Sequence, residues 1–147
     1  MLFLIGVLIL RQDEWAEIEA AYEREVLSIT IPQDITEGVI KLLLSRIDEV
    51  LTRAQFDYAR SKRAYENLER RLKTRTKTYY VDFKASYSDK TADAHATKRV
   101  DDEGLTHQVQ EAYNRYTFMD AVISVLDAKR SMLITDSGIL KIEASLK

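Results

Sequence analysis

The sequence predicts an all-α, mainly helical protein in which two long helices fold back as an antiparallel hairpin or coiled coil. Hydrophobic residues make up 46% of the 147-residue chain, which permits a folded core. The chain has one proline and four glycines, the residues least compatible with helix interiors. Two long series of positions follow steps of four and three residues, as in coiled-coil seams. The length predicts a single domain, 1–147.

The apolar segment MLFLIGVLIL opens the chain and ends at the charged stretch RQDE. A membrane-spanning helix needs about twenty apolar residues, so ten are too few. No basic stretch precedes the segment, as it would in a signal peptide. We expect a buried strand or helix, or a segment that docks on a partner. Attachment to a membrane surface is the less favoured alternative.

A short helix and an extended connector complete residues 1–33. Trp15, Ile18, Tyr22 and Val26 recur at helical spacing. The stretch SITIPQ is rich in β-branched residues, which predicts a small strand or an extended connector. In the following DITE, Asp34 and Glu37 have the spacing of a capping box, which predicts a helix beginning at 34.

The two long helices are expected at 34–72 and 91–135. The first series of regularly spaced positions is Ile40, Leu44, Ile47, Leu51, Ala54, Tyr58, Ser61, Tyr65, Leu68 and Leu72. The second is Leu105, Val109, Ala112, Tyr116, Met119, Ile123, Leu126, Arg130 and Leu133. Because a two-helix hairpin buries only one stripe per helix, we expect the chain to form a homo-oligomer that covers further apolar surface.

The connector 73–90 and the tail 136–147 are less regular. The connector is rich in Thr, Ser and Tyr, which favour strands or turns, and its pattern leaves strand, loop and continued helix open. In the tail, Gly138 suits the position just after a helix end.

Positive charge is concentrated in the middle of the chain. Residues 53–84 hold 10 Lys/Arg and 4 Asp/Glu, whereas residues 1–52 hold 4 and 10. On a helical wheel, the arginines of 53–71 lie opposite the apolar series, with Phe56 among them. Guanidinium groups bind phosphates and aromatic rings stack on unpaired bases, so this pattern suits single-stranded nucleic acid. The predicted binding residues are Arg53, Phe56, Arg60, Arg63, Arg70, Arg71, Lys73, Arg75, Lys77 and Tyr79.

Two other interpretations of the basic face remain open. Charged stripes on long helices are often only solvated, and Arg53–Asp57 and Glu66–Arg70 have the spacing of ion pairs within a helix. The face also fits an acidic partner protein.

No motif predicts catalysis, a metal site or a cofactor. Four scattered glycines build no nucleotide-binding loop. His95 and His107 lack a neighbouring carboxylate pattern of metal-site type, and Asp101, Asp102 and Glu103 would point in three directions on a helix. The chain has no cysteine, which excludes disulfides and fits a reducing, cytoplasmic location.

Several stretches resemble the phage recombination mediators of the UvsY type. In TRAQFDYA, Arg53-Ala54 and Phe56-Asp57-Tyr58 match a family motif, although Gln55 stands where a second basic residue is expected. YTFMDAVISVLDAKRSMLI is similar to the family's last long helix, and ITIPQDI to its extended lead-in. The similarity is spread over residues 29–146, whereas residues 1–26 depart from the family.

The resemblance implies a ring-like homo-oligomer that binds single-stranded DNA. Such a protein helps a RecA-like recombinase replace the single-strand-binding protein on that DNA. Only Arg53 has a counterpart in the family's basic triplet. The alternative function is a structural coiled-coil protein, such as a phage assembly, scaffold or partner-binding component without nucleic-acid binding.

Overall fold

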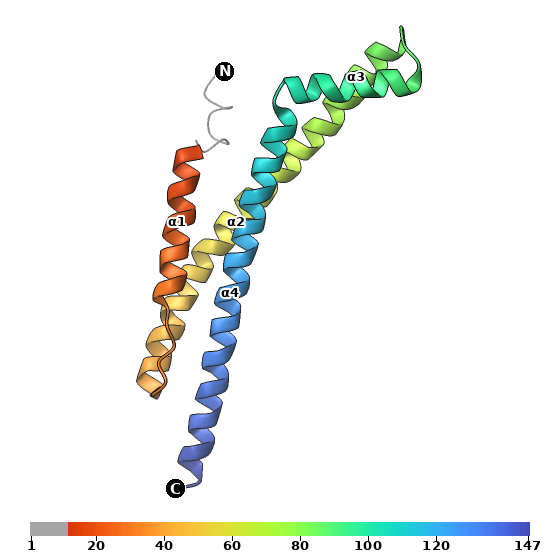
Figure 1. Ribbon diagram of the computed structural model, residues 1–147. Helices are drawn as coiled ribbons and strands as arrows, with labels where there is room; N and C mark the ends of the chain where they lie inside the picture. Colours follow the sequence, from red (N-terminus) through yellow and green to blue (C-terminus); the bar gives the residue numbers. More distant parts are fainter. Residues whose placement is uncertain (1–11) are drawn as a thin grey trace. The chain divides into compact units, whose positions relative to one another are not determined.

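The computed structural model describes residues 12–147, of which 88% lie in four helices (Figure 1). The helices are α1 (Gln12–Ser28), α2 (Glu37–Lys84), α3 (Asp89–Asp102) and α4 (Leu105–Ser145). No strand occurs among these residues. The predicted all-α class is therefore confirmed. The expectations for the apolar segment 1–10 fall outside the described residues.

The chain divides into two compact units. Unit 1 comprises residues 1–57 and 118–147, and unit 2 comprises residues 58–117. Both long helices contribute to each unit, whereas α1 belongs to unit 1 and α3 to unit 2. Within residues 12–147, each unit therefore contains three helical segments.

The core of unit 1 contains many of the positions selected by the four-and-three spacing. These buried side chains are Ile40, Ile47, Leu51, Ala54, Met119, Leu126 and Leu133. Val50 and Val122 are also buried, although they lie outside both series. A helix that packs against two neighbours buries a wider stripe than a helix in a two-stranded seam. Unit 1 contains such a third helix, α1, whose Tyr22 is also buried.

Specific contacts attach α1 to both other segments of unit 1. The Tyr22 hydroxyl donates a hydrogen bond to Asp57 of α2. Lys129 Nζ of α4 donates to the carbonyls of Val26, at 2.7 Å, and Ile29, at 2.6 Å. The last carbonyls of a helix lack partners and carry the negative end of its dipole, so the ammonium group stabilises the end of α1.

Unit 2 has a core of small residues and tyrosines. Its buried side chains are Ala92, Ala96, Val100, Leu105 and Ala112. The Tyr65 ring lies 5.4 Å from the Tyr113 ring and 5.6 Å from the Tyr116 ring, and Tyr58 also contacts Tyr116. In this unit, aromatic rings join α2 to α4; Tyr58, Tyr65 and Tyr116 occupy predicted seam positions, and Tyr113 lies outside the predicted series.

The start of α2 differs from the prediction. The helix begins at Glu37, and its N-cap is Thr36, whose Oγ1 accepts a hydrogen bond from the backbone N–H of Val39 at 3.3 Å. Asp34 lies outside the helix, so the predicted capping box is wrong. Thr36 satisfies an unpaired donor of the first helical turn, which is the role that Asp34 was expected to have two residues earlier.

The expected connector 73–90 is mostly helix, because α2 continues to Lys84. The Thr76 and Thr78 hydroxyls donate to the carbonyls of Leu72 and Thr74 one turn earlier, which satisfies them inside the helix. This part of α2 also contacts α3 and the residue that follows it, and these contacts stabilise the helix. The intrinsic helix propensities of its residues do not include this contribution. The first long helix therefore ends twelve residues beyond its predicted end.

The expected second long helix, 91–135, is interrupted at a glycine. Gly104 has φ +77°, a conformation that suits glycine, and separates α3 from α4. Gly138 lies inside α4, which continues to Ser145, so the predicted helix end at 138 and the separate tail 136–147 are wrong. Spacing alone did not distinguish these two glycines.

Candidate nucleic-acid interface

Nine of the ten side chains predicted to bind nucleic acid are exposed, and Tyr79 is half-buried. Arg53 and Phe56 lie in unit 1. The other eight lie in unit 2 and are Arg60, Arg63, Arg70, Arg71, Lys73, Arg75, Lys77 and Tyr79. The predicted site is thus divided, and its larger part belongs to unit 2.

Arg53 is committed to a contact inside unit 1. Its two terminal nitrogens donate to both carboxylate oxygens of Glu25 on α1, at 2.9 and 2.8 Å. These hydrogen bonds raise the pKa of the guanidinium. Arg53 therefore pairs with another helix, where the sequence suggested Asp57 of the same helix as its partner. Phe56 exposes 63% of its surface and keeps the free ring that the prediction requires.

Arg75 and Tyr79 belong to a cluster that joins α2 to the end of α3. Arg75 donates to Glu103 at 2.9 Å, and the Tyr79 hydroxyl donates to the same carboxylate. These hydrogen bonds, from Tyr79 first and then Arg75, hold the pKa of Glu103 below its usual range. The Tyr79 ring also lies 4.8 Å from the Arg75 guanidinium and 5.1 Å from that of Arg99. Arg75 and Tyr79, both predicted to bind nucleic acid, thus make contacts within the fold.

Three cations form a row on the exposed side of α2, which we call the basic row: Arg63, Arg70 and Lys77. Because they are seven residues apart, successive members are displaced by about 10.5 Å along the helix and by about 20° around it. None of them has an ion pair or hydrogen bond to another residue that the structure describes. Their charges face solvent and can meet a polyanion.

A groove between α2 and α3 lies beside the basic row. It has a volume of about 510 Å³ and is lined by Leu72, Lys73, Thr76, Lys77, Tyr80 and Asp93. Lys77 belongs to both the row and the groove, so the two features form one surface. Lys73 has a weak ion pair with Glu69, at 3.7 Å, with its own side chain 76% exposed. We call the row and the groove together the α2–α3 surface.

The charge of the chain is segregated between the two units. Unit 2 holds 13 Lys/Arg and 9 Asp/Glu, a net charge of +4. Unit 1 holds 9 Lys/Arg and 15 Asp/Glu, a net charge of −6. The α2–α3 surface therefore lies in the unit that attracts a polyanion, whereas unit 1 repels one.

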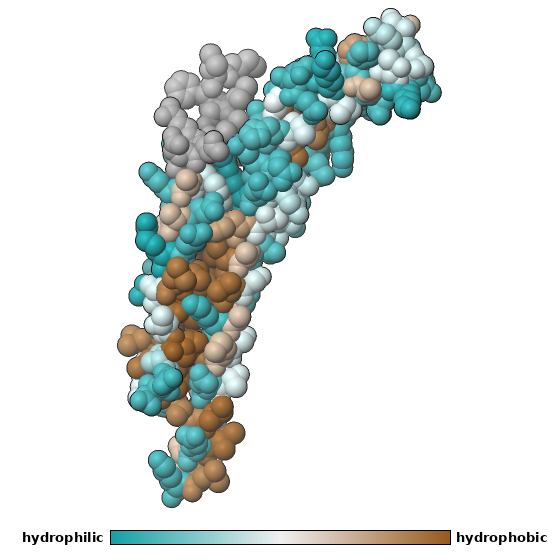
Figure 2. All heavy atoms as spheres, viewed as in Figure 1, coloured by the Kyte–Doolittle hydropathy of each residue, from teal (hydrophilic) through white to brown (hydrophobic). Residues whose placement is uncertain are grey.

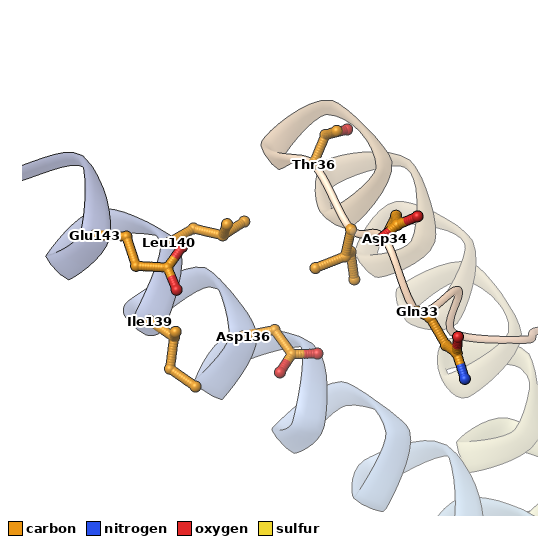
Figure 3. A pocket seen from close by; sticks show the side chains of 8 residues that line it. Gln33, Asp34, Thr36, Asp136, Ile139, Leu140 and Glu143 are labelled. Carbon is orange, nitrogen blue, oxygen red and sulfur yellow. The ribbon is translucent and has the colours of Figure 1, made fainter. Parts of the chain in front are cut away.

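A second hollow, in unit 1, is acidic. It has a volume of about 350 Å³ and lies between the connector before α2 and the C-terminal part of α4 (Figure 3). Asp34 lies on the connector side, and Asp136 and Glu143 project from α4. Among the described residues, no group of three or more His, Asp or Glu side chains is arranged to hold a metal ion. Its negative charge makes this hollow unsuitable for nucleic acid.

Comparisons with known proteins add no assignment. No family model, curated protein or solved structure matches the chain. Within residues 12–147, no helix is both long and apolar enough to cross a membrane.

Several residues that define the site are not apparent from the basic stretch itself. Glu25 and Glu103 remove Arg53 and Arg75 from the available cations, and Asp93 provides one wall of the groove. Each belongs to, or directly follows, a helix other than α2. In the sequence, the only sign of such pairs was the presence of Asp and Glu residues in the neighbouring predicted helices. That sign did not specify which acid pairs with which cation.

Proposed function

We propose that this chain is a non-enzymatic, single-stranded DNA-binding protein that contacts DNA through the α2–α3 surface. We further propose that it works as a homo-oligomer of antiparallel helical hairpins and assists a RecA-like recombinase in replacing the single-strand-binding protein. The observation that carries the binding proposal is the unpaired basic row beside a groove with apolar and aromatic walls. The recombination role rests on the resemblance of TRAQFDYA and the C-terminal helix to mediators of the UvsY type.

The chemistry of the surface suits an unpaired strand. The basic row provides donors for phosphates along a strand, with guanidinium forks at Arg63 and Arg70. In the groove, Leu72 and Tyr80 offer apolar contact to a base, and the Asp93 carboxylate can accept a hydrogen bond from an exocyclic amino group. Only a base released from a duplex stack can enter such a groove, so a single strand is the preferred ligand.

The binding proposal is tested by the salt dependence of affinity. We expect a labelled dT oligonucleotide to bind tightly at low salt and more weakly as salt increases, because neutralised phosphates release counterions. The triple variant Arg63→Gln, Arg70→Gln and Lys77→Gln should weaken binding. For single strands it should reduce the slope of log affinity against log salt by about 2, or about 0.7 for each lost contact. Fluorescence anisotropy measures both quantities.

A matched variant controls for the loss of positive charge. Arg24→Gln, Lys41→Gln and Lys147→Gln remove three exposed cations from unit 1. This variant should retain the wild-type slope, and so should Arg53→Gln, whose charge is already paired with Glu25. An equal loss of affinity in the two triple variants would contradict a site on the α2–α3 surface.

A structural role without nucleic-acid binding is the second candidate. The observation that favours it is the number of large hydrophobic side chains exposed in unit 1, including Leu27, Leu42, Met132 and Ile142. Such side chains suit contacts with other proteins. Absence of oligonucleotide binding at low salt, together with retention by a folded protein partner, would establish this alternative.

A further inference from the structure

The hydroxyl groups that line the groove between α2 and α3 are already committed as hydrogen-bond donors. The Thr76 hydroxyl donates to a backbone carbonyl of α2 at 2.8 Å, and the Tyr80 hydroxyl donates to Asp89 at 3.2 Å. A hydroxyl has a single proton to donate, so both groups can only accept a hydrogen bond from a ligand. Among the lining side chains, the remaining donors are the ammonium groups of Lys73 and Lys77.

The Asp93 carboxylate is an acceptor without a partner. It lines the groove from α3, and within residues 12–147 it makes no ion pair or hydrogen bond. The nearby Asp89, in contrast, pairs with Lys84 at 2.8 Å and accepts a hydrogen bond from Tyr80. An ionised carboxylate accepts through two oxygens and donates nothing. A ligand at this wall therefore needs two adjacent donors to satisfy both oxygens.

The surroundings of the groove are largely polar. On the face of the molecule drawn in Figure 2, hydrophilic residues predominate over α3 and the adjoining part of α2. The apolar walls of the groove are the side chains of Leu72 and Tyr80, both half-buried. Such walls do not distinguish one base from another, because every base has a π-face. Hydrogen bonds therefore determine which base the groove prefers.

We propose that the groove selects an unpaired guanine and that Asp93 is the residue that recognises it; this inference rests on the proposed binding of single-stranded DNA at the α2–α3 surface. The Watson–Crick edge of guanine carries two adjacent donors, N1–H and the 2-amino group, beside the acceptor O6. The two donors match the two oxygens of the Asp93 carboxylate, and a lysine ammonium can donate to O6. An unpaired base leaves this edge free for recognition.

The other three bases match the carboxylate less well. Cytosine and adenine carry one amino group with a ring-nitrogen acceptor beside it, and the N3–H of thymine lies between two carbonyl oxygens. Each would bring an acceptor against one oxygen of Asp93 and leave that oxygen without a hydrogen bond. Leaving a charged acceptor unpaired is costly, so a site built around a carboxylate rejects these bases. Hydrogen bonds to an ionised group are also stronger than neutral ones, which favours guanine further.

The cations around Asp93 make its carboxylate compatible with a nucleic acid. Lys73 and Lys77 line the same groove, and Arg70 belongs to the basic row beside it. Unit 2 as a whole has a net charge of +4. The phosphates of a strand therefore meet cations, while the base that enters the groove meets Asp93.

The test compares labelled oligonucleotides that differ in one base type. The probes are a short dT oligonucleotide and four derivatives in which the same isolated positions carry dG, deoxyinosine, dC or dA. Deoxyinosine retains O6 and N1–H but lacks the 2-amino group. In fluorescence anisotropy at low salt, the dG probe should bind about fivefold or more tightly than the dT probe, as expected for a bidentate contact. The deoxyinosine, dC and dA probes should lose most of this gain.

Asp93→Asn tests the residue, because an amide has one acceptor oxygen and places a donor where the second oxygen was. The variant should abolish the preference for dG over dT, whatever the loss of a negative charge does to the affinity of both probes. Asp82→Asn is the matched control, since Asp82 is exposed, lies in unit 2 outside the groove, and loses the same charge. It should keep the preference, and circular dichroism should show equal helicity for the two variants.

Equal affinities for the dG and dT probes, or a dC or dA probe that binds as tightly as dG, would overturn the selection of guanine and leave the proposed binding of single strands in place. A preference for dG that persists in Asp93→Asn would overturn the role of Asp93. Absence of binding by every probe at low salt would overturn both proposals. The affinity ratio thus separates a failure of base selection from a failure of DNA binding.

Discussion

At the scale of single residues, the identity of a cation's neighbour determines what that cation can do. Arg53 and Arg63 are both exposed arginines on α2, but Arg53 holds Glu25 with two hydrogen bonds and Arg63 has no such partner among the described residues. A guanidinium already paired with a carboxylate must lose that pair before it binds a phosphate. The free members of the basic row are therefore the better ligands for a polyanion.

We expect the stability of the fold to depend on the protonation of the Glu103 carboxylate at acidic pH. Hydrogen bonds from Tyr79 and Arg75 lower its pKa in the folded state below the unfolded value of about 4.3. Its contribution to stability is therefore complete above that value and is lost as the pH falls through the folded-state pKa. Denaturant unfolding of wild type and Glu103→Gln should show a stability gap that is constant near neutral pH and narrows below about pH 4.

Asp102→Asn is the control for this experiment. Asp102 is exposed, adjacent in sequence, and makes no ion pair or hydrogen bond to another described residue. Replacing the Asp102 carboxylate should leave the dependence of the free energy of unfolding on pH unchanged at acidic pH. A Glu103→Gln profile parallel to that of wild type down to pH 3 would contradict the assigned role.

At the scale of elements, Gly104 and Gly138 have different roles. Gly104 has a positive φ between α3 and α4, where a side chain is strained. Gly138 lies within α4 with no atom close enough to clash with an added Cβ. One therefore ends a helix, whereas the other only weakens one.

Alanine at each glycine should change stability in opposite directions. Gly104→Ala should lower the free energy of unfolding by about 1–2 kcal/mol, because an L-residue is strained in the left-handed conformation. Gly138→Ala should raise it by about 0.5–1 kcal/mol, because alanine loses less entropy in a helix. Urea unfolding of dilute protein measures both changes, and equal signs would contradict the assigned helix boundary.

At the scale of the whole molecule, the chain separates two surfaces of different chemistry. Unit 2 carries net positive charge and the α2–α3 surface, whereas unit 1 carries net negative charge and exposed hydrophobic side chains such as Leu42 and Met132. Contacts of these hydrophobic side chains with other proteins and nucleic-acid binding would therefore use different residues. If several copies assemble, each adds a basic surface, and linked weak sites bind a strand more tightly than one site.

This separation predicts where a bound oligonucleotide protects the chain. Lysine acetylation followed by mass spectrometry should show slower reaction of Lys73 and Lys77 when dT oligonucleotide is added at low salt. Lys41 and Lys147 in unit 1, which are also exposed, should react at an unchanged rate. Uniform protection of all four lysines would indicate nonspecific condensation instead of a defined surface.

The sequence by itself determined the helical class, much of the core and the exposed basic face. The steps of four and three selected buried residues such as Ile47, Met119 and Leu126, because apolar burial in a helix follows its 3.6-residue period. The same period placed Arg63 and Arg70 on the opposite, solvated side. These features depend only on local geometry, which the order of residues specifies.

Only the tertiary structure decided where helices end and which cations are free. Residue spacing did not specify that α2 continues to Lys84 or that the chain breaks at Gly104. It also did not specify that Arg53 pairs with Glu25 and Arg75 with Glu103, because these pairs are contacts between different elements. Such contacts join residues 28 positions apart in these two ion pairs. Their energies outweigh the intrinsic preferences of Thr, Ser and Tyr, and no local pattern encodes the partner of a long-range contact.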